Sequence, residues 1–449
     1  MQSRLTLLLG IALVLGLAVT RHSLLASTET PDEKVVFTVA TQYEPLAWLR
    51  GDERFPLGAQ IFVHNGGHEY PLLSGFAASA DPEISFDGTR ILFSGKRKKD
   101  DPWQIWEIST NGANLHSIAP GRDDLVRPLY LPDGRIVFAR KRDGRFQIEA
   151  INQAGGASQV LFFAPGNTLP ADVLRDGRIL FEAAYPFGAT SPEIYTVYPD
   201  GSGVESYRCD HGSARYNARQ LSSGDIVFTK TRSLARFTSP LAHDVAIAAP
   251  VGEYSGDIAE TTSGEWLISW RQSSSRPFQV VRMRPEHLTP TIFIHDKQNV
   301  IQPRILAPRP VPNRFPSALH DWKTANLLAL NVYTSKYSLK PGSVASVRLY
   351  TTGVAGTKTL GTAPVESDGS FFIQVPGDRP LKFELLDKRA QSLYKQRGWM
   401  WARAGEQRIC TGCHAGPEHA PENAVPATLQ RSTIPTDLSG ASELGTGGN

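Results

Sequence analysis

A phrase built on Asp-Gly recurs through the first three hundred residues of this 449-residue chain and constrains its fold more than any other feature. The clearest copies are FDGTRILF at 86–93, PDGRIVF at 132–138 and RDGRILF at 175–181, and weaker ones are SGDIVF at 223–228 and SGEWLIS at 263–269. Their glycines, at 88, 134, 177, 224 and 264, are separated by 46, 43, 47 and 40 residues. A period of forty-odd residues is typical of a four-stranded propeller blade and not of a helical solenoid.

Each Asp-Gly can supply a tight turn with positive φ, and the alternating apolar residues after it predict a buried strand. A second strand and turn follow each time, as in IWEISTNG at 105–112, and IFVHNGG at 61–67 fits the same slot. We therefore expect an all-β protein whose residues 34–301 form a six-bladed β-propeller. The propeller has seven blades instead if residues 292–305 close the ring with a strand at 34–40. These repeats resemble the propeller units of the TolB family, which implies a shape and no particular reaction.

A proline-rich segment, QPRILAPRPVPNRFPS at 302–317, marks a linker at the end of the propeller. Beyond it, residues 318–423 contain alternating strand patterns at 326–350 and 364–386, which predict a small β-sandwich-like domain. The last segment, 424–449, is small, polar and glycine-rich, so we expect a disordered tail.

The N-terminal segment, residues 1–27, has the pattern of an export signal, because a basic Arg4 precedes an uncharged run from Leu5 to Thr20 and small residues follow. A cleaved signal peptide and a retained N-terminal membrane anchor both fit this pattern. Either one predicts a periplasmic or otherwise extracytoplasmic protein. The net charge of +3 is spread along the chain, so the sequence favours no nucleic-acid partner.

Near its end the chain carries Cys410-x-x-Cys413-His414. Two thiols three residues apart can form thioethers with both haem vinyl groups, and the adjacent imidazole can bind the iron. A structural zinc site would need a second Cys or Cys/His pair, and a thioredoxin-like site would need a βαβ context. Only Cys209 remains outside the motif, so the cysteines form no disulfide framework. We expect one haem c with His414 as an iron ligand.

The approach to the motif, GWMWARAGEQRIC, reads as an extended segment. Alternation places Trp399, Trp401 and Arg403 on one face, and Met400 and Ala402 on the other. The tryptophans are candidates to wall the porphyrin, and Arg397, Arg403 or Arg408 could pair with its propionates. The alternative is that both tryptophans are sandwich core. For the sixth iron position the candidates are Met400 and His419, which are near in sequence, and His211 from the propeller, and an open position is equally allowed.

The run from Asp368 to Asn423 resembles the haem-bearing middle domain of the hydrazine synthase alpha subunit family. The shared features are FELLD, the W-x-W tract, AGE and C-x-G-C-H followed by E, P and N. The preceding propeller fits the same family. The resemblance implies a periplasmic haem c protein, and it makes Cys209 and His211 candidate zinc ligands together with His414 or His419. A buried free thiol is the alternative for Cys209. The tyrosine that takes the iron in that family has no counterpart at 415–423, so we expect His414 to bind the iron here.

These features predict an exported, monohaem c-type cytochrome-like protein in which the propeller docks a protein redox partner. A second hypothesis is a haem-dependent oxidoreductase that acts on a small inorganic, nitrogenous substrate. A third is a TolB-like binding protein whose haem is structural. Whether the chain is an enzyme is left open at this point.

Overall fold

The computed structural model describes residues 33–184, 191–208, 213–285, 289–335, 337–353, 356–396, 398–412 and 423–440. Over these ranges the regular structure is strand, apart from two short helices, α1 (Ala47–Arg50) and α2 (Ala427–Arg431). The all-β prediction is confirmed. The predicted signal or anchor segment, 1–27, lies outside the described residues. Within them, no helix has the length and apolar character needed to span a bilayer.

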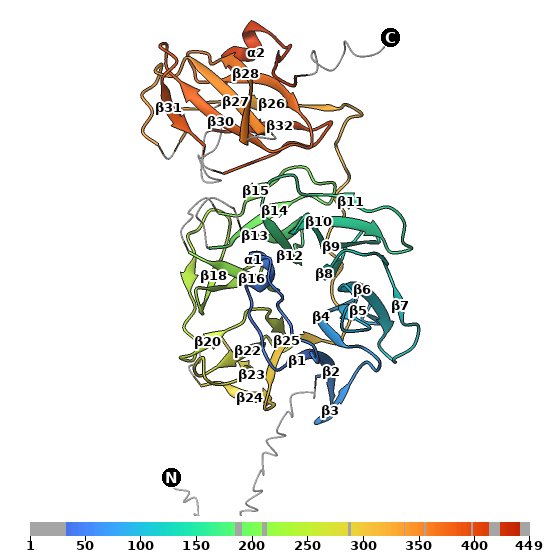
Figure 1. The fold of residues 1–449 in the computed structure, drawn as a ribbon. Helices are drawn as coiled ribbons and strands as arrows, with labels where there is room; N and C mark the ends of the chain where they lie inside the picture. The colour runs from blue at the N-terminus through green and yellow to red at the C-terminus, as the bar shows by residue number, and fades with distance from the viewer. Residues whose placement is uncertain are drawn as a thin grey trace, which may run out of the picture.

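The propeller prediction is also confirmed, because six sheets surround a common centre in Figure 1. In order from the centre outward, the first three sheets are β25 (Asn299–Ile305), β1 (Val35–Ala40), β2 (Gln60–Asn65) and β3 (His68–Pro71); β4 (Ala78–Ile84), β5 (Arg90–Lys96), β6 (Gln104–Ser109) and β7 (His116–Ser117); and β8 (Leu125–Tyr130), β9 (Arg135–Arg142), β10 (Arg145–Asn152) and β11 (Gln159–Val160).

The other three sheets are β12 (Asn167–Val173), β13 (Ile179–Ala184), β14 (Glu193–Val197) and β15 (Glu205–Ser206); β16 (Arg215–Gln220), β17 (Ile226–Lys230), β18 (Ser233–Phe237) and β19 (Val245–Ala246); and β20 (Glu253–Tyr254) with β21 (Ala259–Glu260), β22 (Trp266–Arg271), β23 (Gln279–Met283) and β24 (Thr291–Ile294). Strand β25 pairs with β1 inside the first sheet. This pairing joins the last propeller strand to the first, and it adds no seventh sheet among the described residues.

The innermost strands meet through charged side chains. Arg219 on β16 contacts Glu83 on β4 at 3.1 Å and Asp172 on β12 at 3.2 Å. Arg304 on β25 also contacts Glu83, at 3.2 Å. Burial acts to raise the pKa of Glu83, but the surrounding arginines outweigh it and lower the pKa to about 2. The carboxylate therefore stays ionised and ties strands of different sheets together.

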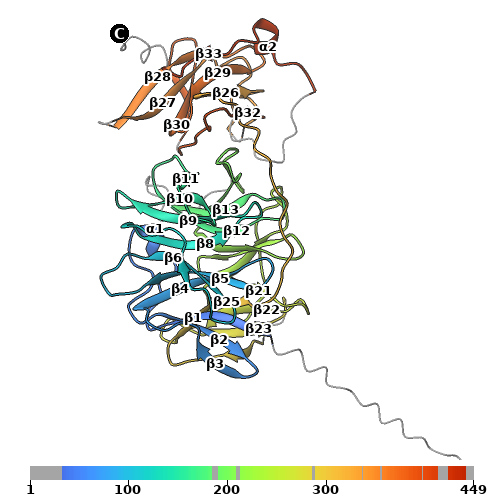
Figure 2. The same ribbon diagram turned by 90° about the vertical axis from the view of Figure 1, so that its right-hand side faces the viewer.

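The linker lies along the propeller instead of hanging free, as Figure 2 shows for the irregular segment that leads up to the second domain. The backbone N–H of Arg309 donates to Phe86 O at 2.9 Å, and that of Asn313 donates to Arg175 O at 2.8 Å. The ring of Phe315 stacks on Tyr198 with 3.9 Å between centroids. Strand β25 runs to Ile305, so the propeller takes the first residues of the predicted 302–317 linker.

The second domain is the predicted β-sandwich. One sheet contains β32 (Gln407–Cys410), β26 (Thr324–Ala329), β29 (Phe371–Pro376) and β33 (Thr436–Asp437), and the other contains β28 (Gly356–Pro364), β27 (Ser346–Gly353), β30 (Leu381–Leu386) and β31 (Ser392–Lys395). Alternate residues of both sheets, such as Leu327, Ile373, Val347 and Leu385, form one buried core between them.

The predicted tail from residue 424 is partly ordered, and in this respect the prediction was wrong. Helix α2 begins where Ala427 N–H donates to the Asp368 carboxylate at 2.7 Å, and Thr428 N–H donates to Ser370 Oγ at 3.0 Å. Strand β33 then pairs in parallel with β29, and Leu438 is buried in the sandwich core. Hydrogen bonds, a short strand pairing and one buried leucine thus order a segment whose composition is typical of disorder. Residues 441–449 lie outside the described part of the chain.

Candidate functional site

Cys410 is the last residue of β32, which lies at the edge of its sheet and pairs in parallel with β26. In this register Cys410 is opposite Ala329, a residue of the sandwich core. The motif residues Cys413 and His414, and also His419, lie outside the described residues. The structure therefore defines the first cysteine of the motif and the strand that leads to it.

The thiol of Cys410 is half-buried and packs against the edge of the sandwich core. Burial raises its pKa, and the guanidinium of Arg408, two residues earlier on the same strand face, acts in the opposite direction. Cys410 forms no disulfide with any described residue. It is a protonated, partly accessible thiol at a strand end, the form that can add to a vinyl group to give a thioether.

Steric crowding explains why position 412, inside the motif, is a glycine. A Cβ on Gly412 would overlap the carbonyl oxygen of Thr334 and would approach Asn331 O to 3.0 Å. The chain therefore passes so close to the turn after β26 that no side chain fits at this position. This close approach fixes the path of the chain directly after Cys410.

The predicted alternation before the motif is present. The backbone of Met400 exchanges hydrogen bonds with Leu381 at 2.7 and 3.0 Å, so residues 399–402 extend the sheet beside β30. Met400 and Ala402 pack into the sandwich core, whereas Trp399 and Trp401 belong to a core cluster that is otherwise made of propeller residues. The tryptophans are thus not sandwich core, which was the alternative considered from the sequence.

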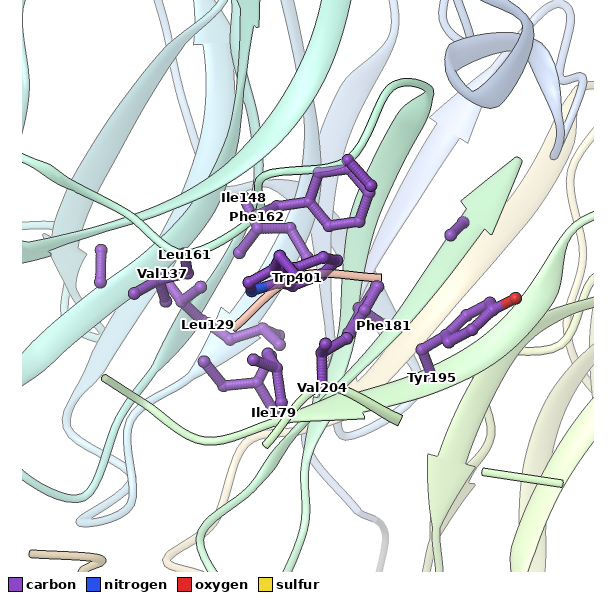
Figure 3. Close-up of a cluster of buried hydrophobic side chains, with 14 of the residues drawn as sticks. Leu129, Val137, Ile148, Leu161, Phe162, Ile179, Phe181, Tyr195, Val204 and Trp401 are labelled. Atoms are coloured by element: carbon purple, nitrogen blue, oxygen red, sulfur yellow. The ribbon is translucent and has the colours of Figure 1, made fainter. Parts of the chain in front are cut away.

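Trp401 is the contact that joins the two domains. Its indole is 1% exposed, and its N–H donates to Gly201 O at 3.1 Å. The ring meets Phe162 edge-on, with centroids 4.8 Å apart. Figure 3 shows it among propeller side chains from two neighbouring sheets, namely Leu129, Val137, Ile148, Leu161, Phe162, Ile179, Phe181 and Val204. Trp401 was expected to wall a porphyrin, but these neighbours enclose it and make it an interdomain anchor.

Arg403, one of the arginines predicted to pair with the propionates, is also engaged by protein. Its Nη1 contacts Asp378 at 2.8 Å, and its guanidinium lies 4.8 Å from the ring centroid of Phe163. Further along, Glu406 accepts a hydrogen bond from Gly203 N–H at 3.1 Å. Arg403 thus fastens the segment that leads to β32 to the propeller, together with residues that follow it.

Arg408 completes the same interface. It donates to Val204 O in the propeller and, at 3.3 Å, to Trp401 O in its own domain. Its propeller partner belongs to the segment that joins β14 to β15, which the sequence identified only as a hairpin turn. Nothing in the turn residues themselves indicates that a second domain binds there, so sequence reasoning missed this contact.

Trp399 has a different environment. The ammonium of Lys382 lies 4.5 Å from its ring centroid, and both side chains are more than nine-tenths buried. The indole N–H of Trp399 is buried and has no hydrogen-bond acceptor among the described residues. Lys382 was not a candidate from the sequence, because its position on β30 looked like that of any outward-facing strand residue.

The remaining candidates are placed as follows. Met400 packs partly buried against the sandwich core. Cys209 and His211 lie outside the described residues, and directly before them the buried Arg208 donates to Leu241 O at 2.8 Å. Among the residues that are described, no three His, Cys, Asp or Glu side chains gather into a metal site.

The residues present fit a covalently attached haem on one observation. Cys410 offers a half-buried thiol without a disulfide partner in the described chain. Such a thiol can form one of the two thioethers that hold a c-type haem.

The comparisons with known proteins agree with the expected resemblance. Residues 332–415 match the model of the hydrazine synthase alpha subunit middle domain. The whole fold is similar to that of Kuenenia stuttgartiensis hydrazine synthase, with a TM-score of 0.78 at 16% identity over 89% of this chain and 71% of that one. TolB from Acinetobacter baumannii gives a TM-score of 0.47 at 14% identity over 63% and 67% of the two chains. No curated protein sequence matches significantly.

The family match begins inside the sandwich, covers Cys410 and ends directly after the Cys-x-x-Cys-His motif. The structural match at 16% identity establishes the fold, a propeller followed by this second domain. The predicted resemblance to the hydrazine synthase alpha subunit is confirmed, and the second domain of this chain is similar to the middle domain of that subunit.

Proposed function

We propose that this chain is an exported, monohaem c-type cytochrome-like protein that transfers electrons to or from a protein partner docked on its propeller. The observation that carries the proposal is the position of Cys410, at the end of an edge strand inside the segment that matches the hydrazine synthase alpha subunit middle domain. Cys410 and Cys413 would hold the haem, and His414 would bind its iron. A bound haem supplies one-electron redox chemistry.

The role of the surrounding residues follows from their contacts. Trp401, Arg408 and Glu406 hold the haem-motif strand against the propeller through Gly201, Val204 and Gly203. A strand fixed in this way keeps the cofactor at a constant distance from a partner that binds the propeller. Because electron transfer depends on such a distance, a rigid attachment supports this function.

Export supports the same proposal, because covalent haem attachment takes place outside the cytoplasmic membrane. The 1–27 segment has the pattern of a signal or anchor. We therefore place the protein in the periplasm or an equivalent compartment, with the membrane involved only through an N-terminal anchor.

A second candidate function is a haem-dependent oxidoreductase acting on a small nitrogenous substrate, which the similarity to hydrazine synthase favours. The TolB-like binding protein with a structural haem is a third. Met400 packs partly buried against the sandwich core, and His419, His211 and an open position are the other candidates for the sixth iron position. Zinc at Cys209 and His211 belongs to the second candidate.

The spin state of the haem separates these functions. The full chain is expressed with export and cytochrome c maturation, and its spectrum is recorded with and without cyanide. A low-spin iron that binds no added ligand supports electron transfer, whereas a high-spin iron that binds cyanide supports the oxidoreductase. A redox-inactive haem supports the structural role. Absence of covalent haem contradicts all three.

A further inference from the structure

The loop between β1 and β2, residues 41–59, lies across one end of the propeller, and we call it the plug. Asn299 at the start of β25 donates to Thr41 O at 3.1 Å, and Asn167 at the start of β12 donates to Leu49 O at 3.1 Å. Figure 1 shows its helix α1 beside the inner strands β12 and β16. One buried cluster joins plug residues to inner strands of several sheets and contains Trp48, Leu49, Phe55, Ala80, Val126, Leu169 and Ile301. The plug therefore covers this end of the propeller axis.

The plug carries a buried cation, Arg54, which is 1% exposed. Its guanidinium lies 5.0 Å from the ring centroid of Trp48, and its Nη2 donates to Pro45 O. The Nε and Nη1 atoms are buried and have no hydrogen-bond partner among the described residues. No carboxylate of the described chain forms an ion pair with Arg54 either. Because a guanidinium cannot lose its proton, this charge is buried without a counterion from the described residues.

The arginines on the inner strands, in contrast, have carboxylate partners. Arg219 contacts Glu83 at 3.1 Å. Arg304 and Arg127 contact Asp257 at 3.0 and 3.6 Å. The propeller thus compensates its buried charges by direct contact along the axis, and the arginine of the plug is the exception among these.

The carboxyl group of Glu182 on β13 is fully buried and lies close enough to Arg54 for their charges to interact. Burial raises the pKa of Glu182, and the charges of Arg127 and Arg54 oppose this only in part. Its Oε1 accepts a hydrogen bond from Asn217 N–H, and its Oε2 is buried without a partner among the described residues. A proton can neutralise this carboxyl group and turn Oε2 into a donor, whereas Arg54 keeps its charge.

We propose that a small inorganic anion, such as chloride, binds beneath the plug as the counterion of Arg54. The unpartnered N–H groups of the guanidinium would donate charge-assisted hydrogen bonds to it. The anion has to be small, because plug residues next to Arg54 and the inner strands pack into one buried cluster. Once bound, it would hold the plug on the inner strands. This inference concerns the propeller and does not depend on the haem.

The test is urea unfolding of the exported, matured full chain in sodium gluconate, with chloride replacing gluconate at equal ionic strength. An anion that binds only the folded state multiplies the folded-to-unfolded ratio in proportion to its concentration above Kd. In wild type we therefore expect each tenfold rise in chloride above Kd to raise this ratio about tenfold. Arg54→Met should lose the chloride dependence, because it removes the cation and its donors.

Arg97→Met is the matched control. The guanidinium of Arg97 also lies over a tryptophan, 4.7 Å from the ring centroid of Trp106, and donates to Gly75 O at 3.3 Å, but it lies outside the plug. This variant should keep the chloride dependence of wild type. Glu182→Gln should keep it as well, because the amide still offers a donor.

Equal stability of wild type in chloride and in gluconate overturns the inference, and so does an Arg54→Met chain that responds to chloride as wild type does. A chloride dependence that appears only in Glu182→Gln overturns it too, since Glu182 would then be the counterion of Arg54. If Arg54→Met does not fold, wild-type crystals grown in bromide decide. An anomalous peak beside the Arg54 guanidinium supports the anion, whereas water alone at this place overturns it.

Discussion

The replacement Trp401→Ala tests whether the two domains are held together as the structure indicates. The indole is 1% exposed and sits in a cluster of propeller side chains, so its loss removes a fully buried ring and leaves a cavity. Trp→Ala changes at such positions cost about 3–5 kcal/mol. The hydrogen bond to Gly201 O is lost as well and leaves a buried carbonyl unsatisfied. We expect the free energy of unfolding to fall by about 4 kcal/mol, which lies inside that range.

The assay is urea unfolding of the full chain followed by far-UV circular dichroism, with proteolysis of the 306–317 linker as a second measurement. Because Trp401 packs into the propeller core, its loss should also separate the unfolding of the two domains and speed cleavage of the linker. Trp322→Ala is the control, since that side chain is 43% exposed and should change stability by under about 1 kcal/mol. If Trp401→Ala costs no more than Trp322→Ala, the interdomain anchor is refuted.

Three further changes test the fold. Glu83→Gln should lower the free energy of unfolding by about 3 kcal/mol at neutral pH, since the pKa of Glu83 falls from 4.5 to about 2 on folding. This contribution is lost as pH falls from 4.5 towards 2, so the stability difference between wild type and variant should shrink in urea unfolding at acid pH. A difference that stays the same in acid would contradict the role of Glu83. Gly177→Ala should lower the free energy of unfolding by about 2 kcal/mol more than Gly134→Ala, as measured by thermal unfolding. Both glycines have positive φ, but only at Gly177 would a Cβ overlap Asn313 O in the linker. Equal losses of stability in the two variants would refute the docked linker. Leu438→Ala should destabilise the second domain by about 3 kcal/mol in urea, whereas a disordered tail would show no effect.

Much of the architecture could be predicted from the sequence because its signals are local. The Asp-Gly turns need positive φ, and Gly88, Gly134 and Gly177 have φ of 71°, 87° and 89°. The alternation at 399–403 was equally readable, since period two alone decides which side chains share a face. What that face contacts was not readable, because packing Trp401 against Phe162 joins residues far apart in the chain.

The difference between local signals and long-range contacts also explains the other features that the sequence did not predict. Leu438 orders the tail through a long-range contact with the sandwich core, which composition cannot indicate. The contact between the Lys382 ammonium and the Trp399 ring forms only because β30 and the segment after β31 lie side by side, which the sequence does not indicate. Cys410 was found from the sequence because covalent haem attachment requires a fixed local spacing of thiols and imidazole.

The most direct test of the central claim is the intact mass of the full chain after export and cytochrome c maturation, measured beside Cys410→Ser. We predict one haem adduct per wild-type chain that survives denaturation and acid-acetone extraction. In the variant the fraction of chains that carry this adduct should fall far below that of wild type. A wild-type chain at its unmodified mass, or a Cys410→Ser chain that carries the adduct as wild type does, would contradict the assignment of this protein as a haem c protein.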